Sequence, residues 1–581
     1  MPFSTESGKQ INPHDPDILI RTLGLDRHTN DEIISKIDER KTVVENLSML
    51  SGVTIMERSP TRIGARMGRP EKSGDRKMKP KVHVLFPVES YGDNRRSIIM
   101  AEDRASDGYE SEVASRKCPK CGNITPVPIC EECGQPTIFA ESKKMNQINL
   151  QRLVSAAENN IKVSLTDIKE FKGVKKLMSD MKACEPLEKG MLRSLHDVSI
   201  NKDGTCRYDM SDIPLTHFKP EEIGTSPKRL HELGYEGEEE FELFPQDVII
   251  PADAARYMLH VSQFIDHLLV SYYRMEPYYS CTKPEDLIGH LVIGLAPHTS
   301  GGIVGRIIGI SHVSGCYAHP LFHAAKRRNC DGDEDSIMLL LDGLLNFSRW
   351  FLPSTRGGLM DAPLVLTLHL KADEVDKEAM NLDTLSEYPE EFYNAAKEEK
   401  MPSTIEGIMI SLKKHESLNG TVMGIGYTHP TRDINEGVTV SAYKTIGSMQ
   451  EKIEKQLGLA EIIRAVDQND VAARVLNSHF LPDIYGNFRA FFSQEFRCTK
   501  CNTKYRRIPL SGKCRKCGNS SINLTIHKAS IVKYLEETIR VSNNYDMPDY
   551  LKARIANLAR TITGTFAEDK EDTLETYEDA S

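Results

Sequence analysis

The sequence lacks any long apolar run. A helix that crosses a membrane needs about 18 or more consecutive apolar residues, and the densest stretch, SIMLLLDGLLNFSRWFL, is interrupted by Asp342 and Arg349. The opening stretch, MPFSTESGKQINPHDPD, is polar and has no apolar core of the kind found in secretory signals. We therefore expect a cytoplasmic protein without a membrane-spanning segment.

The chain also lacks an excess of positive charge and any internal repeat of fixed period. Its 74 basic and 84 acidic residues give a formal net charge of -10, and 39% of its residues are hydrophobic. This balance by itself argues against a nucleic-acid partner, so such a partner must be sought in local patches of charge. A chain of 581 residues is long enough for several globular domains.

Most of the 13 cysteines occur in four CxxC pairs, and five stand alone. The pairs combine into two sets, C-x2-C-x8-C-x2-C and C-x2-C-x12-C-x2-C. Two such knuckles bring four thiolates around one tetrahedral ion, whereas a disulfide framework or a redox role explains the repeated spacing poorly. The pattern predicts two structural zinc sites, formed by Cys118, Cys121, Cys130 and Cys133 and by Cys498, Cys501, Cys514 and Cys517.

Basic and aromatic residues surround the second cysteine set, in FRCTKCNTKYRRIPLSGKC. Such residues can contact phosphates and bases, or they can form a solvated face on a small metal-stabilised module. Both interpretations stay open from the sequence.

A short acidic segment, NCDGDEDS, follows three basic residues directly. Asp331 and Asp333 are two positions apart, so on a strand or an extended loop their carboxylates face the same way. Two carboxylates on one side form a hard-oxygen site for Mg²⁺, the ion used in two-metal phosphoryl chemistry. A calcium loop fits less well, because Ser336 stands where an EF-hand requires glycine and Asp342 where it requires glutamate. A solvated acidic turn remains the other alternative.

A second concentration of charge, RIGARMGRPEKSGDRKMKPK, spans residues 62–81. It holds eight basic residues against two acidic ones, a net charge of +6, and its glycines allow the backbone to approach phosphate closely. On charge alone, the default interpretation of this segment is a solvated loop or a localisation-like patch. If a carboxylate site for a metal exists elsewhere in the chain, a phosphate-binding role becomes the favoured interpretation.

Local patterns predict several elements. Residues 251–275 have the apolar spacing of an amphipathic helix that begins after Pro251. Residues 287–310 are rich in glycine and β-branched residues, which indicates short strands with tight turns, as in a small barrel. KVHVLFPV reads as a strand, and SIMLLLDGLLNFSRWFL as a buried helix. Further helices are expected at 447–476 and 528–565.

Five stretches together resemble one family: RIGARMGRPEKSGDRKMKP, TSGGIVGRIIGIS, YAHPLFHAAKRRNCDGDEDS, RGGLMDAPLVL and FRCTKCNTKYRRIPLSGKC. They are similar to the large, catalytic subunit of the archaeal family-D DNA polymerases (DNA polymerase II), in the family's order and from about residue 50 to 560. Members of that family are longer at the N-terminus, so the resemblance implies a separate N-terminal part of the large subunit as a partner.

The resemblance implies an α+β multidomain protein with two double-psi β-barrels, zinc-ribbon modules and flanking helices. The expected divisions are an N-terminal linker with a helical piece at 1–50, a first barrel with a zinc module (118–133) at 51–250, a second barrel carrying the acidic site at 251–445, a helical segment at 446–490, a second zinc module at 491–525, C-terminal helices at 526–567 and an acidic disordered tail at 568–581.

The resemblance also implies residue roles. Asn329, Asp331 and Asp333 would form the catalytic site, with Asp331 and Asp333 as magnesium ligands. Contacts to phosphate and nucleic acid are expected from Arg66, Arg69, Lys72, Lys77, Lys79, Lys326, Arg327 and Arg328. The implied activity is DNA-directed DNA synthesis in replication by two-metal nucleotidyl transfer, on primer-template DNA with deoxynucleoside triphosphates. A small subunit would supply 3′–5′ exonuclease activity, and a sliding clamp is a further partner to consider.

Two other functions remain open from the residues alone. An enzyme with the same barrels that synthesises RNA has the same chemistry, and only the resemblance favours DNA. A non-catalytic zinc-ribbon scaffold that binds DNA would carry the acidic loop as a structural feature. A scaffold tolerates asparagine at positions 331 and 333, and a polymerase does not.

Overall fold

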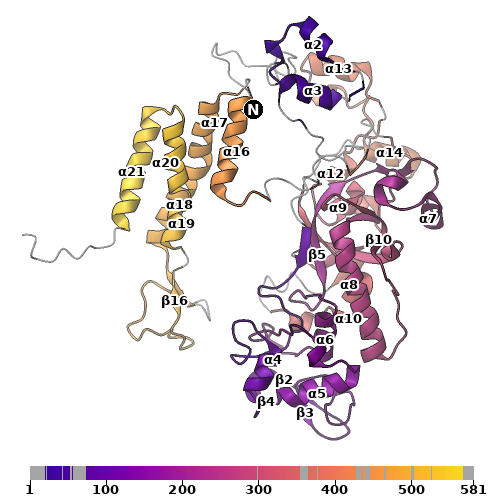
Figure 1. Cartoon of the computed structure of the whole chain (residues 1–581), viewed down its shortest axis with the longest axis vertical. Helices are drawn as coiled ribbons and strands as arrows, with labels where there is room; N and C mark the ends of the chain where they lie inside the picture. Colours follow the sequence, from indigo (N-terminus) through magenta and orange to yellow (C-terminus); the bar gives the residue numbers. More distant parts are fainter. Residues whose placement is uncertain are drawn as a thin grey trace, which may run out of the picture. The chain divides into compact units, whose positions relative to one another are not determined.

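The computed structural model of the chain forms two compact units, residues 1–55 with 445–581 and residues 56–444 (Figure 1). The structure describes residues 20, 23–38, 40–41, 43–52, 55, 73–297, 299–330, 332–353, 364–375, 377–385, 387–426, 433–435, 439, 445–463, 466–498, 503–524 and 526–566. Each unit is taken by itself below.

A closed six-stranded barrel lies at the centre of the unit of residues 56–444. Its strands neighbour one another in the order β5 (Arg207–Pro214), β11 (Gly315–Ala318), β8 (Asp247–Pro251), β10 (Gly301–Ser311), β9 (Leu291–Leu295) and β12 (Glu334–Leu339). The antiparallel pairing of β12 with β5 closes the ring. Strand β1 (Ser73–Arg76) extends the sheet at β5, and β13 (Val365–Thr367) extends it at β10. The α+β class and the strands expected within 287–310 are confirmed.

The barrel draws its strands from both sides of an expected domain boundary. Strands β5 and β8 come from the range expected for a first barrel, and the other four from the range expected for a second. The division expected between residues 250 and 251 therefore runs through this barrel. The barrel spans both ranges because a crossover topology brings strands that are distant in sequence into one sheet.

Helix α8 (Ala252–Leu268) packs against β1, β5, β8, β10 and β12 of the barrel (Figure 1). Pro251 precedes its first turn, and its buried face includes Met258, Val261 and Phe264. A π-helical turn, Leu269–Tyr273, follows. The amphipathic helix expected from residue 251 is therefore confirmed, and its apolar stripe is core.

A smaller α/β part of the same unit carries the first cysteine set. Here β2 pairs with β3 and β4, and α5 packs on α6, which in turn contacts α8. One continuous apolar core joins this part to the barrel. The elements are α4 (Ile98–Arg104), β2 (Tyr109–Lys117), β3 (Ile124–Thr125), β4 (Ile138–Ile148), α5 (Leu150–Ile161) and α6 (Leu187–Leu195).

Shorter elements complete this unit. They are β6 (His217–Phe218), α7 (Pro227–Glu232), β7 (Phe241–Glu242), α9 (Pro320–Ala325), α10 (Leu340–Asn346), α12 (Lys377–Met380), α13 (Glu390–Lys397) and α14 (Leu412–Asn419). The expected buried helix in SIMLLLDGLLNFSRWFL is partly wrong, because its first residues belong to β12. Leu340–Asn346 is an α-helix, and Arg349–Phe351 forms a short 3-10 helix.

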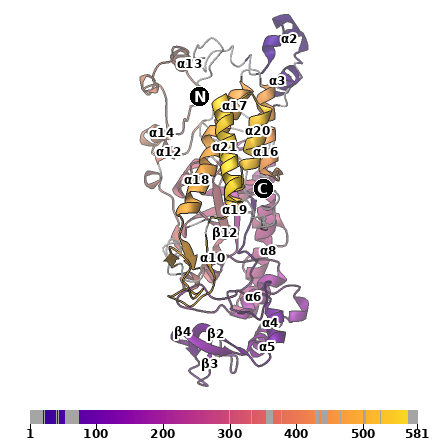
Figure 2. The same cartoon turned by 90° about the vertical axis from the view of Figure 1, so that its left-hand side faces the viewer.

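The second unit contains a helical bundle and a small three-stranded sheet. In the sequence, the sheet lies between the first three helices of the bundle and the last three. Helices α16 to α18 and α19 to α21 share one apolar core, in which the rings of Phe480 and Tyr534 stack with centroids 4.9 Å apart (Figure 2). This agrees with the helices expected at 447–476 and 528–565. The elements are α2 (Asn30–Lys36), α3 (Val43–Ser51), α16 (Met449–Ile462), α17 (Gln468–Val475), α18 (Leu481–Ser493), β14 (Phe496–Cys498), β15 (Lys504–Tyr505), β16 (Ile522–Asn523), α19 (Lys528–Val532), α20 (Leu535–Asn544) and α21 (Asp549–Thr565).

Helix α9 packs against the barrel wall where glycines leave room for it. The fully buried ring of Phe322 lies beside Gly294 on β9 and Gly305 on β10. A Cβ atom at Gly294 would lie 2.7 Å from Cζ of Phe322, closer than packed carbon atoms approach. These glycines therefore set how closely α9, and the loop that follows it, approach the barrel.

Gly294→Ala should lower the free energy of unfolding by about 1–3 kcal/mol, the usual cost of forcing extra atoms into a packed core. Gly301→Ala is the matched control, because nothing lies within 4 Å of a Cβ atom at that position. Urea-induced unfolding of the full chain measures both. Equal effects of the two substitutions would contradict the packing of Phe322 against β9.

Asp342, on α10 after the barrel strand β12, is hydrogen-bonded to the backbone that precedes the barrel strand β5. Its Oδ2 accepts a 2.6 Å hydrogen bond from the backbone N–H of Cys206, just before β5, and its Oδ1 accepts one from Asn346. The carboxyl group is fully buried, and burial raises its pKa to about 6. The folded state therefore binds a proton here more tightly than the unfolded chain does.

The free energy of unfolding should consequently fall as pH rises from about 4 to about 6, by about 2–3 kcal/mol through this one group. Asp342→Asn removes this pH-dependent stabilisation. The free energy of unfolding of wild type, relative to that of the variant, should therefore fall as pH rises over this range. Urea-induced unfolding at pH 4.5, 5.5 and 7 measures the difference. A constant difference would show that Asp342 does not titrate in this range.

Candidate active site

The acidic loop lies between α9 and β12, next to the seam that closes the barrel. Asn329 is exposed, and the side chain of Asp333 is 37% exposed. The backbone N–H of Asp212 on β5 donates a 3.1 Å hydrogen bond to the carbonyl oxygen of Asp333. Asp331 lies outside the described residues, so its predicted role stays a prediction.

Asp333 is surrounded by donors from its own loop. The N–H of Asn329 lies 3.5 Å from its Oδ2, and a guanidinium nitrogen of Arg328 lies 3.8 Å from the same atom. The structure therefore brings Asn329, Asp333 and Arg328 together, as the sequence predicts. An accessible carboxylate in an exposed loop is a donor set that suits a hard divalent cation.

The three adjacent basic residues differ in their surroundings. Arg327 is exposed and Arg328 is half-buried, whereas Lys326 is buried. The amine of Lys326 forms an ion pair with Asp335 and lies over the ring of Phe322. Burial lowers the pKa of this amine. Lys326 was expected to contact phosphate, but its amine is buried against Asp335, and Arg327 is the exposed member of the three.

The structure adds two residues that sequence reasoning missed. A guanidinium nitrogen of Arg76, on β1, lies 2.9 Å from Asp209 Oδ2 and 3.4 Å from Glu334 Oε1. Ser336 donates a 2.5 Å hydrogen bond to the other oxygen of Asp209, and burial raises the pKa of this carboxyl group. Arg76 and Asp209 thus lie beside the start of β12. No local signal marks Asp209, because only the pairing of β5 with β12 brings it to the loop.

The basic segment is only partly described. Arg66, Arg69 and Lys72 lie outside the described residues, and Lys79 is exposed. Lys77 donates a 3.0 Å hydrogen bond to Asp75. Since neighbouring residues of a strand face opposite sides, Asp75 points away from the side on which Arg76 meets Glu334.

Lys77 lines a pocket of about 580 Å³ whose other basic residues are Lys81, Arg256 and His260. The lysines and the arginine are all paired: Lys77 with Asp75, Lys81 with Asp197 at 2.6 Å, and Arg256 with Asp253. The phosphate contact predicted for Lys77 stays a prediction, and this pocket is where the residue would offer it.

The first cysteine set forms a compact cluster at the end of β2. The Sγ atoms of Cys118, Cys121, Cys130 and Cys133 all lie within 4.8 Å of one another, a spacing that one tetrahedral ion can bridge. Gly134 follows the last cysteine with φ 67°, and its N–H donates to the carbonyl of Cys130. Hydrogen bonding from the backbone N–H of Cys121 lowers the pKa of the Cys118 thiol to about 6, which favours the thiolate that a metal needs.

The second cysteine set lies in the sheet β14–β16 of the other unit. The Sγ atoms of Cys498, Cys514 and Cys517 are close enough to hold one metal ion, and Cys501 lies outside the described residues. The turn repeats the geometry of the first set, because Gly518 has φ 71° and donates to the carbonyl of Cys514. Among the described residues, these two cysteine sets are the groups of three or more His, Cys, Asp and Glu that can hold a metal.

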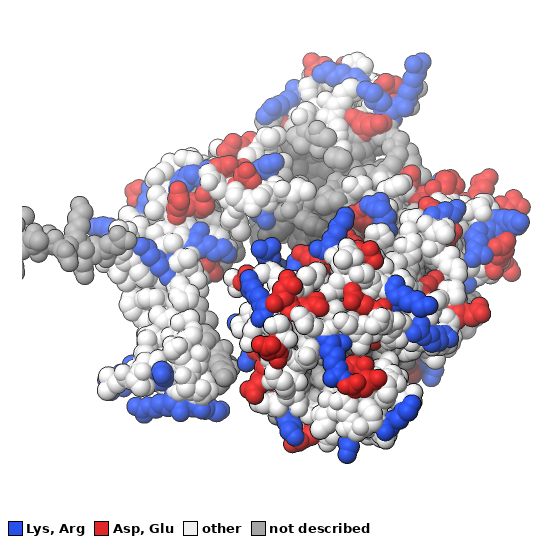
Figure 3. Space-filling view, turned by 60° about the horizontal axis from the view of Figure 1, so that its bottom comes forward, with Lys and Arg blue, Asp and Glu red and all other residues white. Residues whose placement is uncertain are grey.

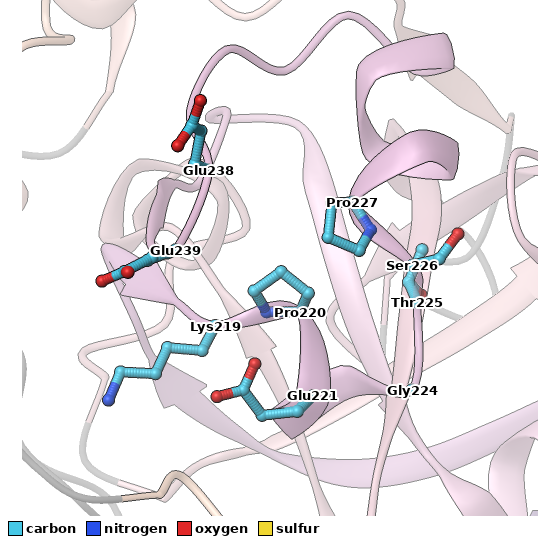
Figure 4. Close-up of a pocket in the computed structure, with 9 residues that line it drawn as sticks. All are labelled: Lys219, Pro220, Glu221, Gly224, Thr225, Ser226, Pro227, Glu238 and Glu239. Carbon is cyan, nitrogen blue, oxygen red and sulfur yellow. The ribbon is translucent and has the colours of Figure 1, made fainter.

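A further pocket, of about 540 Å³, lies away from the candidate residues. Glu238 and Glu239 line one side of it and Thr225 to Pro227 the other (Figure 4). None of the described candidate residues belongs to its lining. Its lining has three glutamates (Glu221, Glu238 and Glu239) and one lysine (Lys219), a charge balance that disfavours phosphate.

Charge on the larger body in Figure 3 is mixed, with basic and acidic side chains interspersed on the face in view. This agrees with the net charge of the chain and leaves polyanion binding to local groups such as Arg327 and Arg328. None of the helices in the described part of the chain has the length and apolar character to cross a bilayer.

Two family models match the chain. The one described as "DNA polymerase II large subunit DP2, catalytic domain" covers residues 164–452, which include the whole barrel and the acidic loop. The one described as "DNA polymerase II large subunit DP2, central domain" covers residues 2–152, which include the first cysteine set.

Curated relatives named DNA polymerase II large subunit match over most of the chain. The one from Thermoplasma acidophilum is 60% identical over 95% of this chain and 51% of the relative. Those from Archaeoglobus fulgidus and Pyrococcus furiosus are 48% and 46% identical, over 94% and 90% of this chain and 51% and 44% of the relatives. The chain thus spans about half the length of the curated relatives it matches. With both domain models matched in order and identities of 46–60%, the chain belongs to the family of archaeal DNA polymerase II large subunits.

Proposed function

We propose that this chain is the catalytic part of a replicative DNA-directed DNA polymerase, in which Asp331 and Asp333 hold the catalytic metal ions. The observation that carries the proposal is the position of the acidic loop at the closing seam of the barrel, inside the segment matched by the catalytic-domain family model. The relatives' names support the reaction class.

The residues of the loop suit a transfer reaction on a polyanion. Asp331 and Asp333 would hold Mg²⁺, which supplies charge compensation at phosphate oxygens when it is bound. The backbone N–H of Asn329 lies 3.5 Å from Asp333 Oδ2 and would help to orient that carboxylate. Arg327, which is exposed, and Arg328, which is half-buried, would bind the phosphates of primer or nucleotide.

Three further assignments belong to the same proposal. The closed barrel is one of two double-psi barrels, and Arg66, Arg69, Lys72, Lys77 and Lys79 of the basic segment bind phosphate. The cysteine sets hold zinc. The partners are the remaining part of the large subunit, a small subunit with 3′–5′ exonuclease activity and a sliding clamp, in the cytoplasm. The half-length coverage of the relatives supports a missing large-subunit part.

Primer extension tests the reaction. The full chain, combined with the rest of the large subunit and the small subunit, should extend a primer with Mg²⁺ and deoxynucleotides. Asp331→Asn/Asp333→Asn should slow extension by at least about 100-fold, the cost of removing one preorganised electrostatic contact. Asp373→Asn, at an exposed acid outside every candidate set, is the matched control.

DNA binding and zinc content should stay unchanged in the double variant. If it extends as fast as wild type, the acidic loop is not the active site and the scaffold interpretation replaces the polymerase. Incorporation of ribonucleotides in preference to deoxynucleotides would instead favour the RNA-synthesising alternative.

Metal analysis tests the cysteine sites. Wild type should contain two zinc ions per chain, because each set offers four thiolates and leaves no open position. Cys130→Ser and Cys514→Ser should each remove one ion, and the double variant both. Cys316→Ala, at a buried cysteine outside both sets, should keep two. Retention of two ions by the double variant would exclude zinc at these sites.

A further inference from the structure

A buried ion pair joins the two ends of the acidic loop. Lys326, directly after α9, and Asp335, within β12, are 0% and 1% exposed at their side chains and contact each other. Between them lie Asn329, Asp331 and Asp333, the candidate ligands. The pair therefore closes the loop at its base, as a short crosslink would.

The side chain of Lys326 is enclosed by packed neighbours. Its stem passes over the ring of Phe322, with the amine 4.3 Å from the ring centroid, and its Cδ would lie 3.4 Å from a Cβ atom at Gly294. Asp335 Oδ1 accepts a hydrogen bond from the N–H of Ser336, and the ring Nδ1 of His323 lies 3.9 Å from Oδ2, the oxygen that pairs with Lys326. Both members of the pair are thus held in one position by packing.

Stability gives a weak reason for such a pair. Removing two charges from water costs about as much as their attraction returns, and apolar replacements of buried pairs are often neutral or stabilising. The barrel already has the backbone ladder between β5 and β12 to hold this seam. The charges at these two positions are therefore better explained by an effect on the acidic loop between them than by stability.

Other contacts also hold the two ends of the loop. The backbone N–H groups of Arg327 and Arg328 donate hydrogen bonds to the carbonyl oxygens of Ala324 and His323 on α9, and Cys330 is buried. The Asp212 N–H to Asp333 carbonyl bond holds its C-terminal side to β5. Arg327 and Asn329 on its other side are exposed, and Arg327 and Cys330 adopt positive φ values of 61° and 57°. A non-glycine backbone in this region is strained and persists only where its surroundings fix it.

We propose that the ion pair between Lys326 and Asp335 is a clamp that sets the shape of the acidic loop for binding a divalent cation, and that Lys326 is a positioning residue and makes no contact with phosphate. This inference rests on the proposed function, because it takes the loop as the metal site.

The test replaces the pair by apolar residues of similar size, Lys326→Met/Asp335→Leu, in the full chain with its partners. Because the two charges of the pair leave together, neither is left buried without the other, and the variant should unfold within a few degrees of wild type. Mn²⁺ binding, followed by electron paramagnetic resonance, should weaken at least tenfold. Primer extension should need at least tenfold more Mg²⁺ while the KM for deoxynucleotide stays unchanged at saturating metal.

The matched control is Arg306→Met/Asp247→Leu, which removes a paired arginine and aspartate (2.7 Å) between β10 and β8 of the same barrel. It should leave Mn²⁺ affinity unchanged. The swapped pair, Lys326→Asp/Asp335→Lys, should recover part of the metal affinity that the apolar pair loses.

Three results would overturn the clamp. Wild-type Mn²⁺ affinity and extension in the apolar variant would show that the loop needs no pair. An unfolded apolar variant would show that the pair serves the fold. A raised KM for deoxynucleotide with unchanged metal affinity would show that Lys326 contacts phosphate. Failure of wild type itself to extend a primer would instead reject the proposed function.

Discussion

The antiparallel pairing of β12 with β5 is the constraint on which the candidate site depends. This ladder closes the six-stranded barrel, and it starts at Glu334, immediately after the acidic loop. Because the register is fixed by residues buried on both faces, a slip by one residue would move every side chain to the other face. Closure therefore sets the position of Asp333 against β5, and it brings Asp209 and Arg76 to the same end of the strand.

The loops near the barrel and those around the cysteine sets are held by different means. Near the barrel, buried charges are paired, as Lys326 with Asp335 and Arg193 with Glu185, and Asp342 accepts a hydrogen bond from the backbone before β5. In the small sheets around the cysteine sets, a metal ion held by thiolates would add folding energy to what packing supplies. In both sets the glycine after the last cysteine, Gly134 or Gly518, has a positive φ that allows the same tight turn.

Sequence reasoning succeeded where local pattern and tertiary environment agree. The helix from residue 252 follows its apolar spacing, and the glycine-rich stretch forms β9 and β10. It failed where burial on all sides removes the periodic signal. The residues SIML belong to β12, because a central barrel strand is apolar on both faces and has the pattern of a buried helix. Val82–Val88 is buried and extended, yet it joins no named strand, because its hydrogen bonds go to loop residues such as Lys172 and Val174.

The sequence by itself determined the chemistry of this protein: two sets of four thiolates, a pair of aspartates two positions apart, and a basic segment. These features can be recognised from residue spacing within short stretches, because ligands of one ion that are close in sequence can converge without help from distant parts of the chain. Only the tertiary structure decided which charges meet. Arg76, Asp209 and Glu334 are far apart in the chain and converge through strand pairing, and Lys326 turned inward because glycine on β9 leaves room for it. Neighbouring basic residues look alike in a sequence, and packing separates the one that is buried from those that face solvent.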